Sequence, residues 1–287
     1  MEGISRRHHF KRNSVSFLGT LALSLFVAGA VQAASPKEIH IGFIPGEGVA
    51  DLKARSEELA QLLEKRTGLK IKPYVGTSYG DLVQKIVEKK IDFAFLSALS
   101  FVEVEEKVGV KVLLKKVWDQ GFYYSVILSK TNSSVRKPSD LRGKRIAFVD
   151  ERSASGYLYP QALLKEAGLD VKKDLKSTVF SGGHDKSVEL LKKGEVDAIA
   201  VFSNDKKGRD SAWTQNGGKT KEARIVWASD AIPNDPFCVR DEFYQKHPKI
   251  AHDLMFSLIE MNEDAELGPE LKRLLGVSSL MVATSQQ

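Results

Sequence analysis

The sequence predicts an α/β protein with two lobes, in which sheets are covered by helices. Short apolar runs that are typical of buried strands alternate with amphipathic helical patterns along the chain. This alternation occurs in two successive series, which favours two lobes over one continuous sheet. The length of 287 residues allows one large domain or two modest lobes, so it agrees with that interpretation.

The first series occupies the N-terminal half of the chain. Apolar or alternating runs predict its strands, and apolar residues at helical spacing predict its helices. Gly68 follows the first helical pattern, as is common where a helix ends. The expected strands are residues 40–45, 69–75, 91–96, 110–117 and 123–128, and the expected helices are residues 48–66 and 79–89.

The second series begins at residue 145, and an amphipathic helix is expected near the C-terminus at residues 249–261. Its expected strands are residues 145–149, 177–180, 196–202 and 225–228, and its expected helices are residues 158–167 and 185–193. If the two series fold as two lobes, the cleft between them is the natural place for a ligand.

The composition is ordinary for a globular protein, with 42% hydrophobic and 28% charged residues. Cys238 is the only cysteine, which excludes an intrachain disulfide, and no Cys/His spacing resembles a zinc site. Of the net charge of +6, half lies in residues 1–33, which leaves a weak case for a nucleic-acid partner. No cofactor or metal motif is found.

The first 33 residues have the order of a secretory signal peptide. Basic residues from Arg6 to Arg12 precede an apolar stretch at residues 15–30, and an Ala-x-Ala pattern ends at Ala33. A membrane anchor is the alternative, and the pair Arg6 and Arg7 leaves Sec and twin-arginine export open. We expect cleavage near Ala33 and export of the remaining chain.

Two turns between a strand and a helix carry the most informative residues. Ser153 and Ser155 follow the strand 145–149, and Gly156 lets the backbone turn tightly there. Unpaired N–H groups and the helix dipole favour an anion at such a helix N-terminus. His184 stands at the equivalent place in the next unit, after Ser181-Gly-Gly. Each turn alone is more typical of a plain helix cap, and the repetition favours an anion site.

Eight tracts then occur in an order that resembles the phosphate/phosphite/phosphonate-binding proteins of bacterial ABC importers. The resemblance runs from about residue 38 to 275. The tracts are Gly76-Thr-Ser-Tyr79, Ile91-Asp-Phe-Ala94, Tyr123-Tyr-Ser125, Ser139-Asp-Leu-Arg-Gly-Lys144, Ser153-Ala-Ser-Gly156, Gly183-His-Asp185, Val196-Asp-Ala198 and Ile232-Pro-Asn-Asp235.

The resemblance implies a periplasmic-binding-protein fold of type II, with a mixed sheet in each lobe and the ligand cleft at the hinge. Lobe 1 would combine residues 34–128 and 229–287, and lobe 2 would be residues 129–228. The implied function is capture of a phosphonate, phosphite or phosphate by hinge closure and delivery to an ABC permease in the inner membrane. A monomer suits this mechanism, and the function requires no cofactor.

The resemblance also implies the residues that hold the ligand. Ser153, Ala154 and Ser155 match the loop that binds the phosphorus oxygens, and His184 matches an oxyanion-binding histidine. Tyr79 would reach the same oxygens from lobe 1, and Asp235 would lie near the other end of the ligand. Either Tyr123 or Tyr124 would line the cleft, a choice that the sequence leaves open.

The chain departs from the family pattern at two places. Ala154 stands where threonine is common, which removes one hydroxyl donor. Leu96-Ser-Ala-Leu99 stands where a glycine-proline turn is usual. Both changes touch the expected pocket lining, so the sequence does not rank the phosphorus compounds. Asp235 could accept a hydrogen bond from a protonated oxygen or pair with a ligand ammonium group.

Three other functions are alternatives to a phosphorus-oxyanion importer subunit. An enzyme would use Cys238 and His184 as nucleophile and base, but Cys238 lies in an apolar stretch typical of inert buried cysteines. The acidic cluster of Glu103, Glu105 and Glu106 is interpreted as a solvated helix face. A periplasmic sensor subunit for a signalling receptor, and a binding protein for another oxyanion or small organic anion, remain as alternatives on the same fold.

Overall fold

The first of two six-stranded sheets mixes parallel and antiparallel strands. These details come from a computed structural model, which describes residues 36–46 and 48–283. In this sheet β1 pairs in parallel with β2 and β3, while β11 and β12 run antiparallel to their neighbours. Its strand order is β12 (Ser279–Val282), β4 (Val110–Val117), β11 (Pro236–Arg240), β3 (Phe93–Phe95), β1 (Ile39–Phe43) and β2 (Ile71–Val75).

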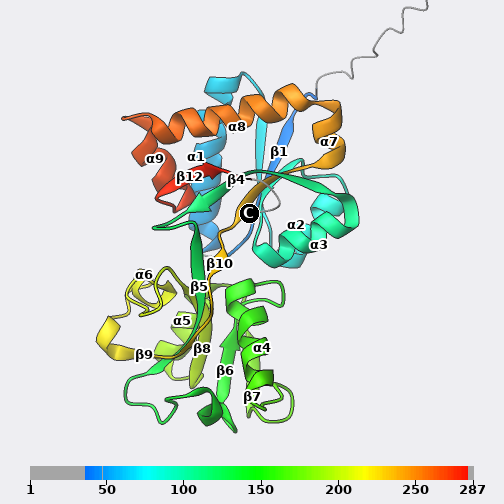
Figure 1. The fold of residues 1–287 in the computed structure, drawn as a ribbon. Coiled ribbons are helices and arrows are strands. Elements are labelled where there is room, and N and C mark those ends of the chain that lie inside the picture. Colours follow the sequence, from blue (N-terminus) through cyan, green and yellow to red (C-terminus); the bar gives the residue numbers. More distant parts are fainter. Residues whose placement is uncertain (1–35, 47, 284–287) are drawn as a thin grey trace, which may run out of the picture. The chain divides into compact units, whose positions relative to one another are not determined.

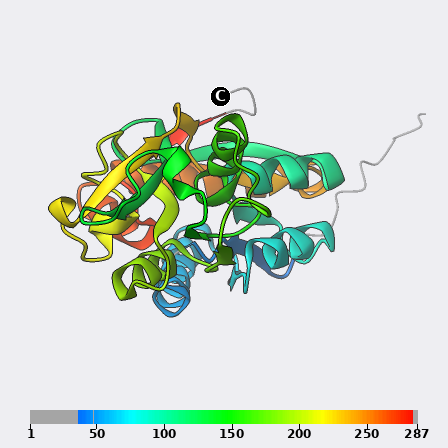
Figure 2. The same ribbon diagram turned by 90° about the horizontal axis from the view of Figure 1, so that it is seen from below.

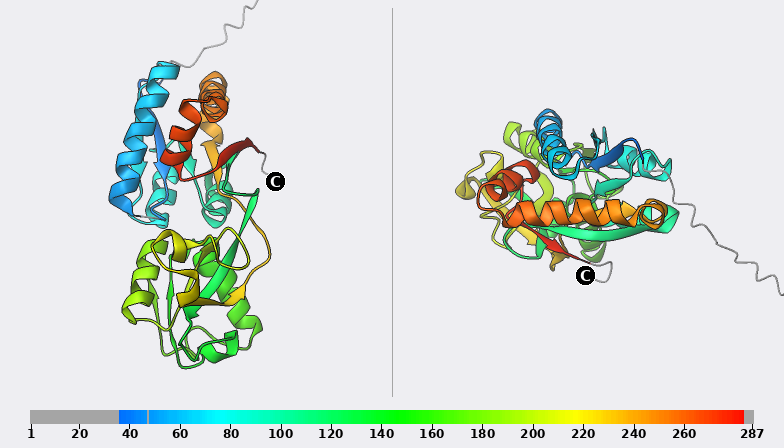
Figure 3. Two further views of the ribbon diagram at one scale, coloured as in Figure 1. Left: turned by 90° about the vertical axis from the view of Figure 1, so that its left-hand side faces the viewer. Right: turned by 90° about the horizontal axis from the view of Figure 1, so that it is seen from above.

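Side chains alternate between the two faces of this sheet, as strand geometry requires. Phe95 and Phe237 pack on one face with ring centroids 4.5 Å apart, while Ala94 and Cys238 face the other. The first face is covered by α1 (Val49–Thr67), α7 (Asp241–Lys246), α8 (Pro248–Glu263) and α9 (Leu267–Leu275), of which α1, α8 and α9 lie side by side in Figure 3. The opposite face is covered by α2 (Tyr79–Val87) and α3 (Ala98–Val108).

The second sheet is also mixed (Figure 1). Here β6 pairs in parallel with β7 and β8, and β5 runs antiparallel to β8, β9 and β10. The strand order is β10 (Ile232–Pro233), β5 (Phe122–Lys130), β8 (Ala198–Ser203), β6 (Arg145–Phe148) and β7 (Ser177–Phe180), with β9 (Ala223–Ala228) also paired to β5.

The faces of the second sheet are covered by separate apolar clusters. Phe148 packs with Leu164 of α4 (Tyr159–Glu166) on one face. Ala147 packs with Val188 of α5 (His184–Lys193) and with α6 (Ala212–Gln215) on the other. Figure 2 shows α5 as the yellow-green helix in the view from below. Short helical turns complete this part: η1 (Pro138–Leu141), the π-helical turn η2 (Ala154–Leu158) and η3 (Thr220–Glu222).

Strand pairing shows where the chain changes sheets. β5 pairs only with strands of the second sheet over its whole length, which includes residues 128 and 129. The crossings between the sheets lie at residues 118–121 and 234–235. Apolar runs reveal strands but not their partners, so the sequence alone does not give these positions. Asn234 ties the two crossings together, because its Nδ2 donates to the carbonyl of Gln120 at 2.7 Å.

The predicted signal peptide, residues 1–33, lies outside the described residues. Within the part of the chain that the structure describes, no helix is both long and apolar enough to span a bilayer. The division into lobes at 34–128, 129–228 and 229–287 stays a prediction.

Candidate functional site

One pocket gathers loops from both sheets around an empty space of about 880 Å³, part of it open to solvent. Seven of the eight predicted site residues line it: Tyr79, Tyr123, Ser153, Ala154, Ser155, His184 and Asp235. Tyr124 does not, because side chains alternate along β5, and its ring packs against Phe122 and lies 5.3 Å from the ammonium of Lys206.

The turn from β6 into η2, residues 150–156, is held by hydrogen bonds within itself. We call it the η2 loop. Ser153 caps η2, its Oγ accepting from the amide of Gly156 at 3.0 Å, and its own amide donates to the carbonyl of Asp150 at 2.9 Å. A Cβ on Gly156 would stand 2.5 Å from the side chain of Val149, so only glycine fits there. The first amides of η2, at Ala154 and Ser155, have no helical partner and are available to a ligand.

Ser155 is fixed by two neighbours on β5. Its carbonyl accepts a hydrogen bond from Ser125 Oγ at 2.7 Å, and its side chain is hydrogen-bonded to Tyr123. Burial raises the pKa of Tyr123 well above its usual range, and the nearby Asp235 and Tyr79 raise it further. The phenol therefore stays protonated and remains a hydrogen-bond donor at the pocket wall.

The second turn lies beside the first, because the amide of Gly182 donates to the carbonyl of Val149 at 2.8 Å. His184 begins α5 at this turn, and its amide donates to the carbonyl of Gly46, in the loop after β1, at 3.1 Å. The two Gly/Ser turns predicted from sequence are thus neighbours at one edge of the sheet, in contact with the first sheet's loops.

The His184 ring is buried and meets the ring of Phe202 edge-on, with centroids 4.9 Å apart. Burial lowers the pKa of His184 to about 3, so the imidazole is neutral at pH 7. A neutral imidazole carries one N–H donor and one acceptor. Its Nδ1 is buried without a hydrogen-bond partner among the described residues, which leaves this atom to a ligand.

This buried histidine predicts a pH dependence of stability. In the unfolded chain the ring binds a proton near pH 6.5, and in the folded chain only near pH 3. Between these values the unfolded state binds more protons, so the free energy of unfolding falls as pH falls below 6.5. From pH 7 to pH 5 the loss should be about 2 kcal/mol. Urea unfolding of the wild type and of His184→Gln at both pH values measures this loss. An equal fall of the unfolding free energy with pH in the two proteins would contradict its assignment to His184.

Several residues that line the pocket were not predicted from the sequence. Arg55 on α1 contributes a guanidinium that also pairs with Asp51 at 2.8 Å. Lys116 on β4 places its ammonium 5.2 Å from the ring centroid of Phe95, and its amide donates to the carbonyl of Asp235 at 2.9 Å. Lone charged residues in a helix or a strand carry no sequence signal. The other missed lining residues that matter here are Trp118 and Asn204, whereas Ser97 belongs to the tract 96–99 that was expected at the pocket lining.

Residues considered for other chemistry lie elsewhere. Cys238 is buried in β11, and burial raises the pKa of its thiol well above the usual range, so it is a poor nucleophile. Among the described residues, no group of three or more His, Cys, Asp or Glu side chains could hold a metal ion.

A profile of the family described as ABC transporter, phosphonate, periplasmic substrate-binding protein matches residues 41–286. The chain belongs to this family. The family consists of substrate-binding proteins rather than enzymes and places the chain in the periplasm. The predicted family and the predicted fold of two mixed sheets flanked by helices are confirmed.

Relatives of this chain carry related names. The phosphate-import protein PhnD of Mycolicibacterium smegmatis is 30% identical over 255 residues, which cover 82% of this chain and 78% of that protein. A phosphonates-binding periplasmic protein of Escherichia coli is 27% identical over 233 residues, covering 79% and 68%. The structure of PhnD1 from Prochlorococcus marinus in complex with methylphosphonate has a TM-score of 0.75 at 20% identity, covering 88% of this chain and 95% of that one.

Proposed function

We propose that this protein captures a phosphorus oxyanion, namely a phosphonate, phosphite or phosphate, in the pocket between its two sheets. It closes around the ligand by a hinge at residues 118–121 and 234–235, and as a monomer delivers the ligand to an ABC permease. The convergence of seven predicted binding residues on one pocket carries the proposal. The names of the M. smegmatis and E. coli relatives support the phosphorus class.

The chemistry of the pocket suits an anion held mainly by neutral donors. Hydroxyl groups of Ser153 and Ser155, the first amides of η2 and the neutral ring of His184 lie at one side. Such fixed dipoles at a helix N-terminus stabilise negative charge without a matching cation. The loss of a hydroxyl at Ala154 leaves the amide as the donor at that position.

Asp235 is proposed to select the substituent on phosphorus. Replacing it with asparagine should weaken binding of 2-aminoethylphosphonate at least tenfold, because the ammonium loses its carboxylate partner. Binding of methylphosphonate, which has no ammonium, should be unchanged or tighter, since one negative charge leaves the pocket. Calorimetric titration of both ligands measures the ratio. Equal weakening of the two ligands would contradict the role of Asp235.

A thermal-shift screen tests the proposed function. The protein is unfolded and refolded to remove carried ligand, and then mixed with phosphate, phosphite, methylphosphonate, 2-aminoethylphosphonate, sulfate and ethanesulfonate. A ligand present at 100 times its Kd should stabilise the fold by about 2.7 kcal/mol. We expect a phosphorus compound to give the largest shift. A shift from sulfate or ethanesulfonate alone, or from none of the compounds, would overturn the proposal.

A further inference from the structure

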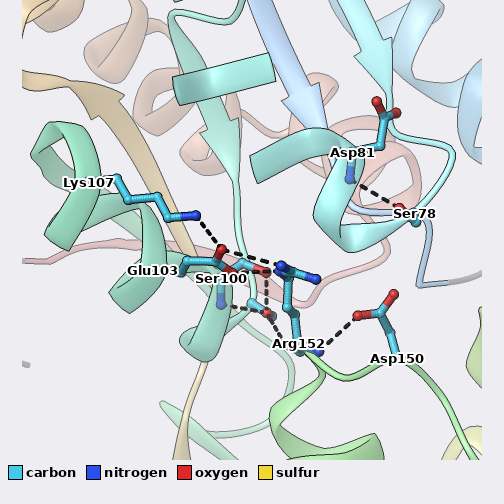
Figure 4. A network of polar contacts seen from close by, with 8 residues as sticks. Ser78, Asp81, Ser100, Glu103, Lys107, Asp150 and Arg152 are labelled. Atoms are coloured by element: carbon cyan, nitrogen blue, oxygen red, sulfur yellow. Dashed lines mark hydrogen bonds and ion pairs between the residues drawn. The ribbon is translucent and has the colours of Figure 1, made fainter. Parts of the chain in front are cut away.

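The η2 loop is joined to the first sheet's helices by an ion pair outside the pocket. Arg152, the residue before Ser153, places its Nε 2.6 Å from Oε2 of Glu103 on α3 and its Nη2 3.4 Å from Oε1 (Figure 4). Glu103 was expected on a solvated helix face, which is wrong for this residue. Glu105 and Glu106 are exposed, but the side chain of Glu103 is only 22% exposed.

A second contact joins the same two segments through the main chain. Ser97 Oγ donates to the carbonyl of Arg152 at 2.9 Å. Ser97 also caps α3, because its Oγ accepts from the amide of Ser100 at 3.2 Å. Ser97 at the start of α3 therefore holds the backbone of Arg152, while Glu103 in the middle of the helix holds its side chain. Ser97 also lines the pocket.

Within its own lobe, Arg152 is bound to the start of the η2 loop. Its amide donates to Oδ1 of Asp150 at 2.8 Å, a contact drawn in Figure 4. The Arg152 guanidinium, with Lys107 on the same helix as Glu103, lowers the pKa of Glu103, so the carboxylate is ionised at neutral pH. An ionised pair therefore lies directly beside Ser153 and the amides of η2.

We propose that Arg152 is a positioning residue, and that its contacts with Glu103 and Ser97 form a closure latch which fixes the η2 loop for the ligand. The inference rests on the proposed function, because hinge closure is what captures the ligand. The latch joins residues of the two lobes, so it forms in the closed state and is lost in the open state. Contacts made only in the closed state favour that state and slow release of the ligand.

A double-mutant cycle tests the latch. Glu103→Gln, Arg152→Gln and the double variant are titrated with methylphosphonate and with inorganic phosphate. Each single variant should bind the probe about tenfold more weakly, mainly through faster dissociation. The double variant should bind no more weakly than either single variant, since all three lack the same pair.

The chain contains a matched control pair. Arg145 of β6 and Asp197, before β8, form an ion pair of similar exposure and two-pronged geometry, with Nε–Oδ2 at 3.1 Å and Nη2–Oδ1 at 2.8 Å. Both residues belong to the second sheet, so their pair does not change on closure. Asp197→Asn should lower the melting temperature without changing the Kd of the probe. If Glu103→Gln behaves like Asp197→Asn, the pair is merely structural and the latch is overturned.

A second readout does not depend on ligand. Spin labels on cysteines that replace the exposed residues Glu57 of α1 and Glu189 of α5 report the distance between lobes. The native Cys238 is buried and should not react. Glu103→Gln should reduce the population with the short distance, and an unchanged distribution would overturn the latch. If the wild type binds neither probe, the proposed function fails, and this readout alone decides the latch.

Discussion

Replacing both Ser155 and His184 with alanine should weaken binding of methylphosphonate at least a hundredfold. Each residue offers a buried polar group to the pocket from a different element, η2 or α5. Loss of one such hydrogen bond to an anion should cost about tenfold in affinity, or about 1.4 kcal/mol. Because the two side chains act from separate elements, their effects should add approximately. Isothermal titration calorimetry of the single and double variants measures these losses.

Ser129→Ala is a matched control for the serine change. Ser129 is buried in β5, the strand that contacts η2, but its hydroxyl donates to the carbonyl of Val135 at 2.7 Å rather than to the pocket. This variant should lose stability and keep its affinity. If the double variant of Ser155 and His184 kept wild-type affinity, the site would have to lie elsewhere.

Gly156→Ala should have an effect of similar size through the backbone alone. The added Cβ would stand 2.5 Å from the Val149 side chain and 2.8 Å from Ser153 Oγ, closer than atoms can pack. The η2 loop must shift, which breaks the Ser153 cap and moves the amides that face the ligand. We expect at least a hundredfold weaker binding and a loss of about 1–3 kcal/mol in unfolding free energy from overpacking.

Gly143→Ala separates this steric effect from the general cost of replacing a glycine. Gly143 has a φ of 71°, and a Cβ there would meet nothing within 4 Å. Its replacement should cost about 1 kcal/mol of stability through backbone strain and should leave the Kd unchanged. Near-normal binding by Gly156→Ala would show that the η2 amides do not hold the ligand.

The elements that the sequence predicted well are those with strong periodicity. The helix expected at 249–261 corresponds to α8 at Pro248–Glu263, and the helix expected at 48–66 corresponds to α1 at Val49–Thr67. β11 escaped notice, and so did α9, although its buried residues recur at helical spacing. In β11, Pro236 is the first residue of the strand. Both faces of the strand are buried, so exposed and buried residues do not alternate along it. The strands that pair with β5 could not be predicted either, because pairing depends on residues far away in the sequence.

The site residues that could be predicted from the sequence are those that lie within a recognisable backbone motif. The two Gly/Ser turns mark Ser153, Ser155 and His184 directly, and the structure brings them to one pocket. Lys116 and Glu103 have no local motif, since their roles come from what the fold places opposite them. The choice between Tyr123 and Tyr124 required the pairing of β5, which decides the face of each side chain.

The most direct test of the central claim is a crystal structure of the refolded protein with the strongest binder of the phosphorus panel. The account predicts phosphorus oxygens at about 2.6–3.2 Å from the Ser155 hydroxyl, the His184 ring and the first amides of η2. It also predicts that Arg152 and Glu103 are paired in that complex. A phosphorus group bound outside this pocket, or one turned away from η2, would contradict the account.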